Sequence, residues 1–244
     1  MAKSSGLGDN FYVGGFDLSG DINSLTRIGG GPNPLDVTGI DKSAHERLGG
    51  IKDGSIEFVS YMNDSLGQAH KTLSALPTTD VSLYYARGTT LGNQAACLIS
   101  KQINYDATRG TDAMLTFQVQ ALANGFGLEW GTQLTAGKRS DTTATNGTAV
   151  DFLAASSFGW QAYLQVFSFT GTSCTVTLED SANNIAFAPF TSSAFVAATA
   201  VGTQRIFGTT TSTVRQYVRA VTSGTFSECT FAVMLVKNES TVAF

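Results

Sequence analysis

The chain has 244 residues, of which 42% are hydrophobic and only 14% are charged. This balance excludes a disordered chain, which needs many charged and few apolar residues, and the length allows one large domain or two ordinary ones. Fifteen Lys and Arg against nineteen Asp and Glu give a net charge of −4. Such a chain has no basic footprint of the kind that holds nucleic acid.

The sequence predicts neither a targeting signal nor disulfide bonds. No run of about 18 apolar residues occurs, so no membrane-spanning helix is expected. Residues 1–6 contain no apolar core, which predicts that there is no secretory signal. The three cysteines Cys97, Cys174 and Cys229 are expected to be reduced, small core residues, and the latter two to lie on strands from which they can face each other.

Strand patterns surround one helix in the first part of the chain. Alternating apolar residues predict a strand over residues 55–61. Asp64 or Ser65 can cap a helix with apolar residues three and four apart, which Pro77 ends. Further strands are predicted over residues 81–85, 95–103, 114–122 and 125–134.

The composition changes near residue 150. Residues 1–151 carry a net charge of −4, whereas residues 152–244 hold four basic and four acidic residues. Residues 135–148 contain no large apolar side chain, which predicts an exposed linker over 135–149. The alternative is a long hairpin loop inside a single domain.

The second part, residues 150–244, is predicted to be all β. Apolar and polar residues alternate through several runs, and turn signals at 170–172 and 223–225 separate them. Roughly seven or eight short strands of this kind are typical of an immunoglobulin-like sandwich or a jelly roll. The fold class expected for the whole chain is therefore mainly β.

No motif predicts catalysis, a cofactor or a metal. The Gly-rich residues 27–32 lack the Lys-Ser/Thr of a phosphate loop and read as a flexible connection. Asp41 and Glu46 flank His45, but this stretch is highly polar and reads as a solvated or interface surface rather than an acid–base cluster. No zinc, calcium or nucleophile-elbow spacing is present, so an enzyme is not expected.

A stronger signal lies in residues 35–58. They read Leu-Asp-Val-Thr-Gly-Ile-Asp at 35–41, Glu-Arg-Leu-Gly-Gly-Ile-Lys-Asp-Gly at 46–54 and Ser-Ile-Glu-Phe at 55–58. This series resembles the major tail-tube proteins of long-tailed, siphovirus-type bacteriophages, and the order of elements agrees over residues 10–135. Ile51 stands where the family often has leucine, and the minimal family fold does not need the C-terminal part.

The resemblance implies a structural virion protein that forms hexameric rings, stacked into the phage tail tube as a conduit for DNA ejection. Residues 1–134 would be the tail-tube domain, a β-sandwich or barrel with one α-helix, and 150–244 an outer β-sandwich decoration domain. The partners would be other copies of the chain, with tape-measure protein and transiting DNA held without specific binding in the lumen. A host surface glycan is a candidate partner for the C-terminal domain, and assembly would occur in the host cytoplasm with no membrane involved.

Within this frame, residues 36–54 are expected to be a long loop that contacts other subunits rather than a closed surface hairpin. Isolated loops rarely carry several apolar residues among charged ones without a surface on which to bury them. The contact residues would be Asp36, Ile40, Asp41, Glu46, Arg47, Leu48, Ile51, Lys52 and Asp53.

The alternation of apolar and polar residues along two predicted strands also indicates which residues face the lumen. Ile56 and Phe58 on one strand, and Phe117 and Val119 on another, require a buried face. The opposite face carries the candidates Ser55, Glu57, Thr116, Gln118 and Gln120. The rival assignment puts this polar face on the outside of the tube.

A second function class remains open, namely a carbohydrate-binding β-sandwich surface protein. It accounts for the Ser- and Thr-rich second part, but not for residues 36–58 or for the absence of a secretory signal.

Overall fold

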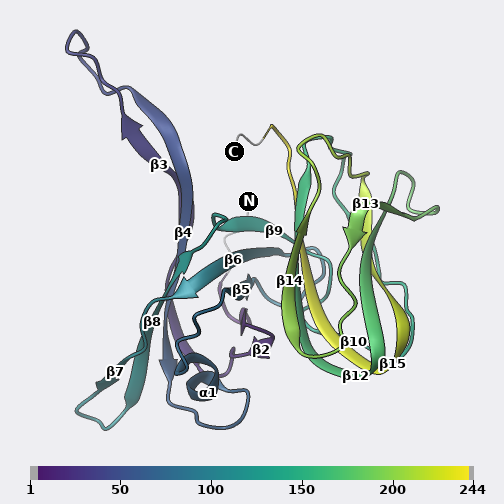
Figure 1. Ribbon diagram of the computed structural model, residues 1–244, viewed down its shortest axis with the longest axis horizontal. Coiled ribbons are helices and arrows are strands. Elements are labelled where there is room, and N and C mark those ends of the chain that lie inside the picture. The colour runs from purple at the N-terminus through teal and green to yellow at the C-terminus, as the bar shows by residue number, and fades with distance from the viewer. Residues whose placement is uncertain (1–4, 242–244) are drawn as a thin grey trace. The chain divides into compact units, whose positions relative to one another are not determined.

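A computed structural model describes residues 5–241, and Figure 1 shows that they are almost entirely β. The described residues form fifteen strands and one short helix, which confirms the mainly β fold. The chain divides into two compact units. We call residues 21–83 and 98–129 the arm unit, and residues 5–20, 84–97 and 130–241 the sandwich unit.

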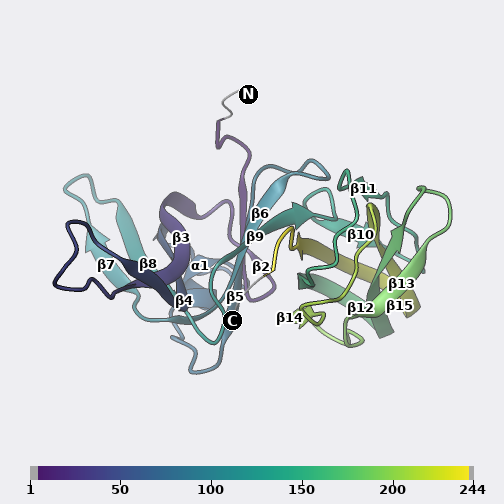
Figure 2. The same cartoon turned by 90° about the horizontal axis from the view of Figure 1, so that it is seen from above.

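The arm unit is built on antiparallel strands. Strand β4 (Arg47–Tyr61) pairs with β3 (Ile22–Asp36) and β8 (Leu115–Ala123), and β8 also pairs with β7 (Asp106–Arg109) and with the end of β6 (Gln94–Gln102). β7 and β8 lie side by side at one edge of this sheet (Figure 2). Strand β5 (Val81–Ala86), like β6, is shared between the two units.

The helix α1 (Ala69–Leu73) is shorter than the predicted segment up to Pro77. Gly67 has a φ of +77°, a conformation that a right-handed helix does not contain, so the predicted start at Asp64 or Ser65 is wrong. The first turn instead begins where the backbone N–H of Ala69 donates to Asp21 Oδ2 at 2.9 Å. The helix lies on the apolar face of β8, since the ring of His70 is 5.8 Å from that of Phe117.

Two long strands dominate the sandwich unit. β12 (Trp160–Ser181) and β15 (Tyr217–Lys237) form one antiparallel ladder, flanked by β13 (Ala188–Ala194), β14 (Gly202–Phe207) and β9 (Glu129–Gln133). Shorter strands complete the unit: β1 (Asn10–Val13), β2 (Phe16–Asp17), β10 (Arg139–Asp141) and β11 (Val150–Asp151).

The turns predicted at 170–172 and 223–225 are wrong, because both lie inside this ladder. Gly171 pairs with Phe226 and Gly224 pairs with Cys174, with register shifts around Gly171. Glycine suits an irregular strand as well as a turn, because it adopts positive φ: +151° at Gly171 and +115° at Gly224. The ladder continues through these positions, so that two long strands replace four of the predicted short ones.

The core of the sandwich unit shows that the ladder folds over on itself. Trp160 and Leu164 from the first half of β12 and Val176 and Leu178 from its second half belong to one buried cluster. Both halves therefore face the same core, as in a β-sandwich. Cys174 and Cys229 are buried in this cluster without a disulfide and hydrogen-bond to each other, as their strand positions predicted.

The unit boundaries differ from the expected division at residues 134–150. The stretch 135–149 contains β10, in which Arg139 pairs with Phe231 of β15 and its Nη1 donates to Ala220 O at 2.8 Å. Small polar residues bury little surface themselves, but their backbone can still pair with a strand. Among the described residues, no helix is both long enough and apolar enough to cross a membrane.

Candidate functional site

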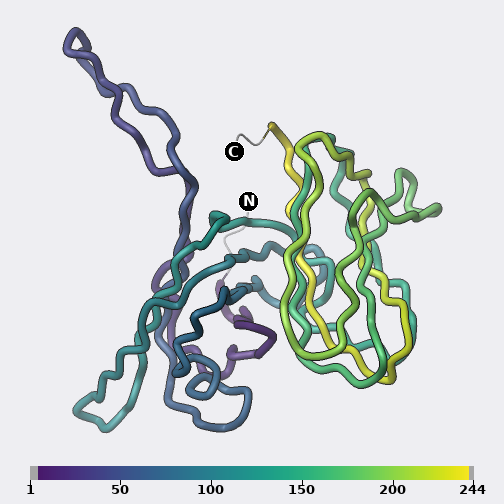
Figure 3. Tube along the Cα trace, viewed as in Figure 1, coloured from purple at the N-terminus to yellow at the C-terminus, as the bar shows by residue number. Residues whose placement is uncertain are grey.

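A projecting hairpin is the main feature of the arm unit. The pairing of β4 with β8 begins at Ser55 and Leu122. Residues 30–54, which we call the arm, extend beyond that point as two limbs that run side by side in Figure 3. The limbs pair from Gly30 with Gly54 out to Asp36 with Arg47. The expectation of an open loop over 36–54 is therefore wrong for residues 47–54, which are strand, and only residues 37–46 form the tip.

The apolar residues of the arm lie in solvent. Ile40 at the tip is fully exposed, and Ile51 is 85% exposed. Leu35, Val37 and Leu48 are about half exposed. A hairpin only two strands wide has no interior in which to bury such side chains. Exposed apolar side chains gathered on one short hairpin are a feature that contact sites for other molecules often share.

The tip is ordered by its own polar contacts. Thr38 Oγ1 accepts from the backbone N–H of Glu46 at 2.9 Å, and His45 Nδ1 lies 3.0 Å from Asp36 Oδ2. The hydroxyl and backbone N–H of Thr38, followed by His45, lower the pKa of Asp36. Glu46 pairs with Lys42 at 3.3 Å. His45 and Glu46 thus have separate partners, which agrees with a solvated surface rather than an acid–base cluster.

The five lumen candidates share one face of the sheet. Glu57 lies opposite Gln120 in the register of β4 and β8, and Gln120 Nε2 donates to Glu57 Oε1 at 3.4 Å. Ser55, which is buried in the single chain, donates to the same oxygen at 3.4 Å. Gln118 and Thr116 follow on the same side of β8. We call these residues the polar face; the opposite side of the two strands carries the buried Ile56, Phe58, Phe117 and Val119.

A polar hollow of about 410 Å³ joins the polar face to the root of the arm. Arg27 and Asn33 of β3 line it together with Asp53, Glu57 and Gln120. Arg27 Nε lies 4.0 Å from Glu57 Oε1. Sequence reasoning missed Arg27 because residues 27–32 read as a flexible connection, and no motif included Asn33. In the structure both residues are part of β3.

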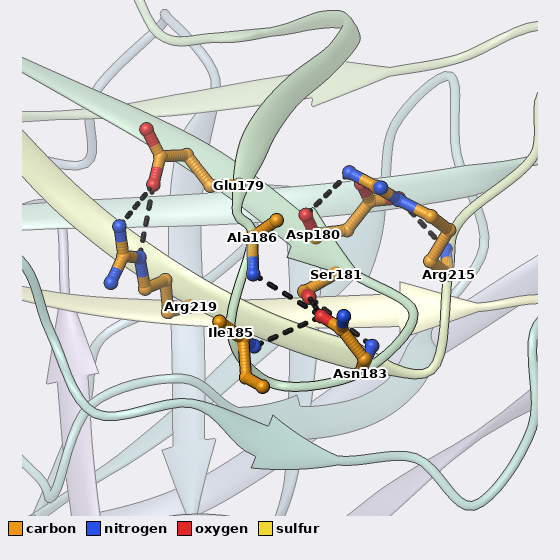
Figure 4. Close-up of polar contacts among 8 residues, drawn as sticks. All are labelled: Glu179, Asp180, Ser181, Asn183, Ile185, Ala186, Arg215 and Arg219. Carbon is orange, nitrogen blue, oxygen red and sulfur yellow. Dashed lines mark hydrogen bonds and ion pairs between the residues drawn. The ribbon is translucent and has the colours of Figure 1, made fainter.

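Two acidic residues of β12, Glu179 and Asp180, are each held by an arginine (Figure 4). Glu179 pairs with Arg219 at 2.7 Å, and the buried Asp180 pairs with Arg215 at 2.6 Å. These carboxylates point to opposite sides of β12, because consecutive strand residues do. They therefore do not form the paired carboxylates of a glycan hydrolase.

The turn beside these pairs is closed by Asn183, whose Oδ1 accepts the backbone N–H groups of Ile185 and Ala186 (Figure 4). No group of three or more His, Cys, Asp or Glu within the described part of the chain is placed to hold a metal ion.

Comparison with known proteins gives weak structural similarity only. No family model and no curated protein matches the chain. A chain from the virion of a native gene transfer agent particle aligns at 12% identity and a TM-score of 0.43, over 52% of this chain and 98% of that one.

Two further solved structures align at 10% identity and TM-scores of 0.33. The Dit protein of phage SPP1, described as a hub adsorption apparatus, covers 94% of this chain, and a chain of the phage p2 baseplate in its activated conformation covers 95%, with 99% of each of those chains aligned. TM-scores below 0.5 do not establish a shared fold, and so these similarities assign the chain to no family.

Proposed function

We propose that this protein is a structural virion protein that polymerises as stacked hexameric rings into the tail tube of a bacteriophage, the conduit for DNA ejection. The observation that carries the proposal is the arm, which holds five apolar side chains in solvent on a hairpin without a third strand. An arm of this kind gains stability only when it packs on another molecule. The same residues carry the resemblance to tail-tube proteins, so we take the other molecule to be a second copy.

The edges of the arm-unit sheet support self-assembly. Within the described residues, β3 pairs with β4 alone and β7 pairs with β8 alone. Each therefore presents unpaired backbone groups along one side, which is a template for another strand. In a closed ring, the edge of one copy pairs with the edge of the next, and the ring leaves no edge open.

The polar face would then line the lumen. The five side chains of this face are neutral or acidic, the neighbouring Arg27 is paired with Glu57, and residues 1–151 carry a net charge of −4. A wall of this charge does not hold a polyanion, so DNA and the tape-measure protein would pass without specific binding. The proposal locates the protein in the virion tail, with assembly in the host cytoplasm.

Electron microscopy of the purified protein tests the proposal directly. Rings or tubes at micromolar concentration are the expected result. A monodisperse monomer at every concentration would contradict it, and a monomer that binds glycans in solution would favour the carbohydrate-binding protein instead.

The charge of the polar face gives a separate prediction. The double variant Gln118→Lys and Gln120→Lys adds two positive charges per copy, and we expect several-fold slower DNA release from particles at low salt. The defect should weaken as salt is added, because the Debye length falls from about 10 Å at 0.1 M to about 3 Å at 1 M. The matched control is Ile185→Lys with Val196→Lys, at two exposed positions of the sandwich unit. Unchanged ejection in particles with normal tails would place the polar face outside the lumen.

A further inference from the structure

We infer that Leu128, seated against Gly30 and Gly54 at the root of the arm, is the positioning residue that fixes the direction of the arm. The two glycines pair with each other across the hairpin, one step beyond the last residue of β4 that pairs with β8. Leu128 lies in the segment that follows β8, five residues after its end at Ala123.

The contact is too close for any residue other than glycine. A Cβ on Gly54 would lie 2.7 Å from the backbone nitrogen of Leu128 and 2.8 Å from its Cβ, and a Cβ on Gly30 would lie 3.0 Å from the same Cβ. Carbon atoms at optimal contact are about 3.5–4.0 Å apart. At Gly54 the three nearest atoms all belong to Leu128, whereas a Cβ on Gly30 would also meet Asp53 O at 2.6 Å and Gly54 Cα at 3.0 Å. Leu128 therefore occupies the space that a side chain at position 54 would take, and it closes the same space beside Gly30.

The arm has few other supports at this point. Beyond Ser55 no third strand pairs with the hairpin in the described part of the chain, and residues 29–31 of β3 are three successive glycines with no side chains to pack. Glycine weakens a strand and permits bending. Gly127, the neighbour of Leu128, also lies against the β4 limb, since a Cβ on Gly127 would lie 3.2 Å from Lys52 Cβ. The segment that ends at Leu128 thus braces the hairpin where it is most able to bend.

Because the arm is long, a small change of its angle at this brace becomes a large displacement of the tip. Six residues separate Gly30 from Asp36, where the paired strands end, which at ~3.3 Å per residue makes a lever of ~20 Å up to the base of the tip. A tilt of ~10° at the root would move that end by ~3.5 Å at this strand rise, and Ile40, farther out in the tip, by more. If the proposed function is right, a redirected arm would also disturb the stacking of rings, and that consequence rests on the proposed function. The direction of the arm itself is a property of the single chain.

The test compares two glycines of the same strand. We expect Gly54→Ala to displace Leu128 and redirect the arm. In Gly49→Ala, the matched control, the new Cβ would meet Pro32 Cβ at 3.5 Å, an ordinary contact. Spin labels on Ile40→Cys and Gln118→Cys, both exposed, report the tip-to-sheet distance by double electron–electron resonance. The native protein and the control should share one narrow distribution, and Gly54→Ala should be shifted or broadened by several ångströms.

A second variant, Leu128→Gly, covers the case in which Gly54→Ala does not fold. It removes the Cβ and side chain of Leu128, which lie against both glycines, keeps its backbone and adds no atom. We again expect a broadened distribution, with unchanged far-ultraviolet circular dichroism. A native distribution in either folded variant would overturn the inference. Assembly is scored separately: if the distances change as expected but the native protein forms neither rings nor tubes, the positioning role stands and the proposed function fails.

Discussion

Replacing Ile40, Leu48 and Ile51 of the arm by Ser, Thr and Thr is expected to abolish ring and tube assembly while leaving the fold intact. All three side chains are more than half exposed in the single chain, so each substitution should change the free energy of unfolding by no more than about 0.5 kcal/mol. In an assembly, each would be buried on a neighbouring copy, at roughly 1–2 kcal/mol per side chain. The sum is about 3 kcal/mol or more, which corresponds to a rise of more than about a hundredfold in the concentration needed for assembly.

The measurement is sedimentation of polymer against total protein concentration, with electron microscopy of the pellet. Leu153, Ile185 and Val196 provide the matched control, because they are equally exposed apolar residues of the sandwich unit. Their triple replacement by Ser should leave the assembly threshold unchanged. If both triple variants raise the threshold equally, the effect is general surface hydrophobicity and not contact by the arm.

Truncation after Ala149 is expected to yield insoluble protein rather than a smaller assembling unit. The cut removes β12 and β15, which complete the packing of the N-terminal segments within the sandwich unit. Gly15 N donates to Gln165 Oε1 at 2.8 Å, and the ring of Tyr12 lies 4.8 Å from that of Phe167. Without these partners, Tyr12 and Leu134, both buried in the whole chain, would be exposed.

A variant truncated after Thr241 keeps both long strands whole and serves as the control. It should be as soluble and as thermally stable as the full chain, while the fragment 1–149 should be recovered from inclusion bodies. Soluble 1–149 with a cooperative unfolding transition would show instead that the chain divides at residues 134–150, as the composition suggests, and would allow the C-terminal part to act as a separate decoration.

The local pattern of strands could be read from the amino-acid sequence alone. The alternation in residues 55–61 and 114–122 placed Ser55 and Glu57, and likewise Gln118 and Gln120, opposite the buried side chains, because strand side chains point to alternate faces whatever the partner strand is. The sequence also marked residues 36–54 as unusual, since apolar residues beside many charges are visible without any structure.

Which distant segments pair with each other became visible only in the folded chain. Residues 27–32 look flexible alone, yet they form β3 because β4 lies beside them, and this pairing brings Arg27 to Glu57. The glycines at 171 and 224 predict turns locally, but the ladder of β12 and β15 continues through both positions, with register shifts around Gly171. The contact of Leu128 with Gly30 and Gly54 joins residues that are far apart in the sequence. Such contacts depend on the long-range arrangement of the sheet, which composition and periodicity do not contain.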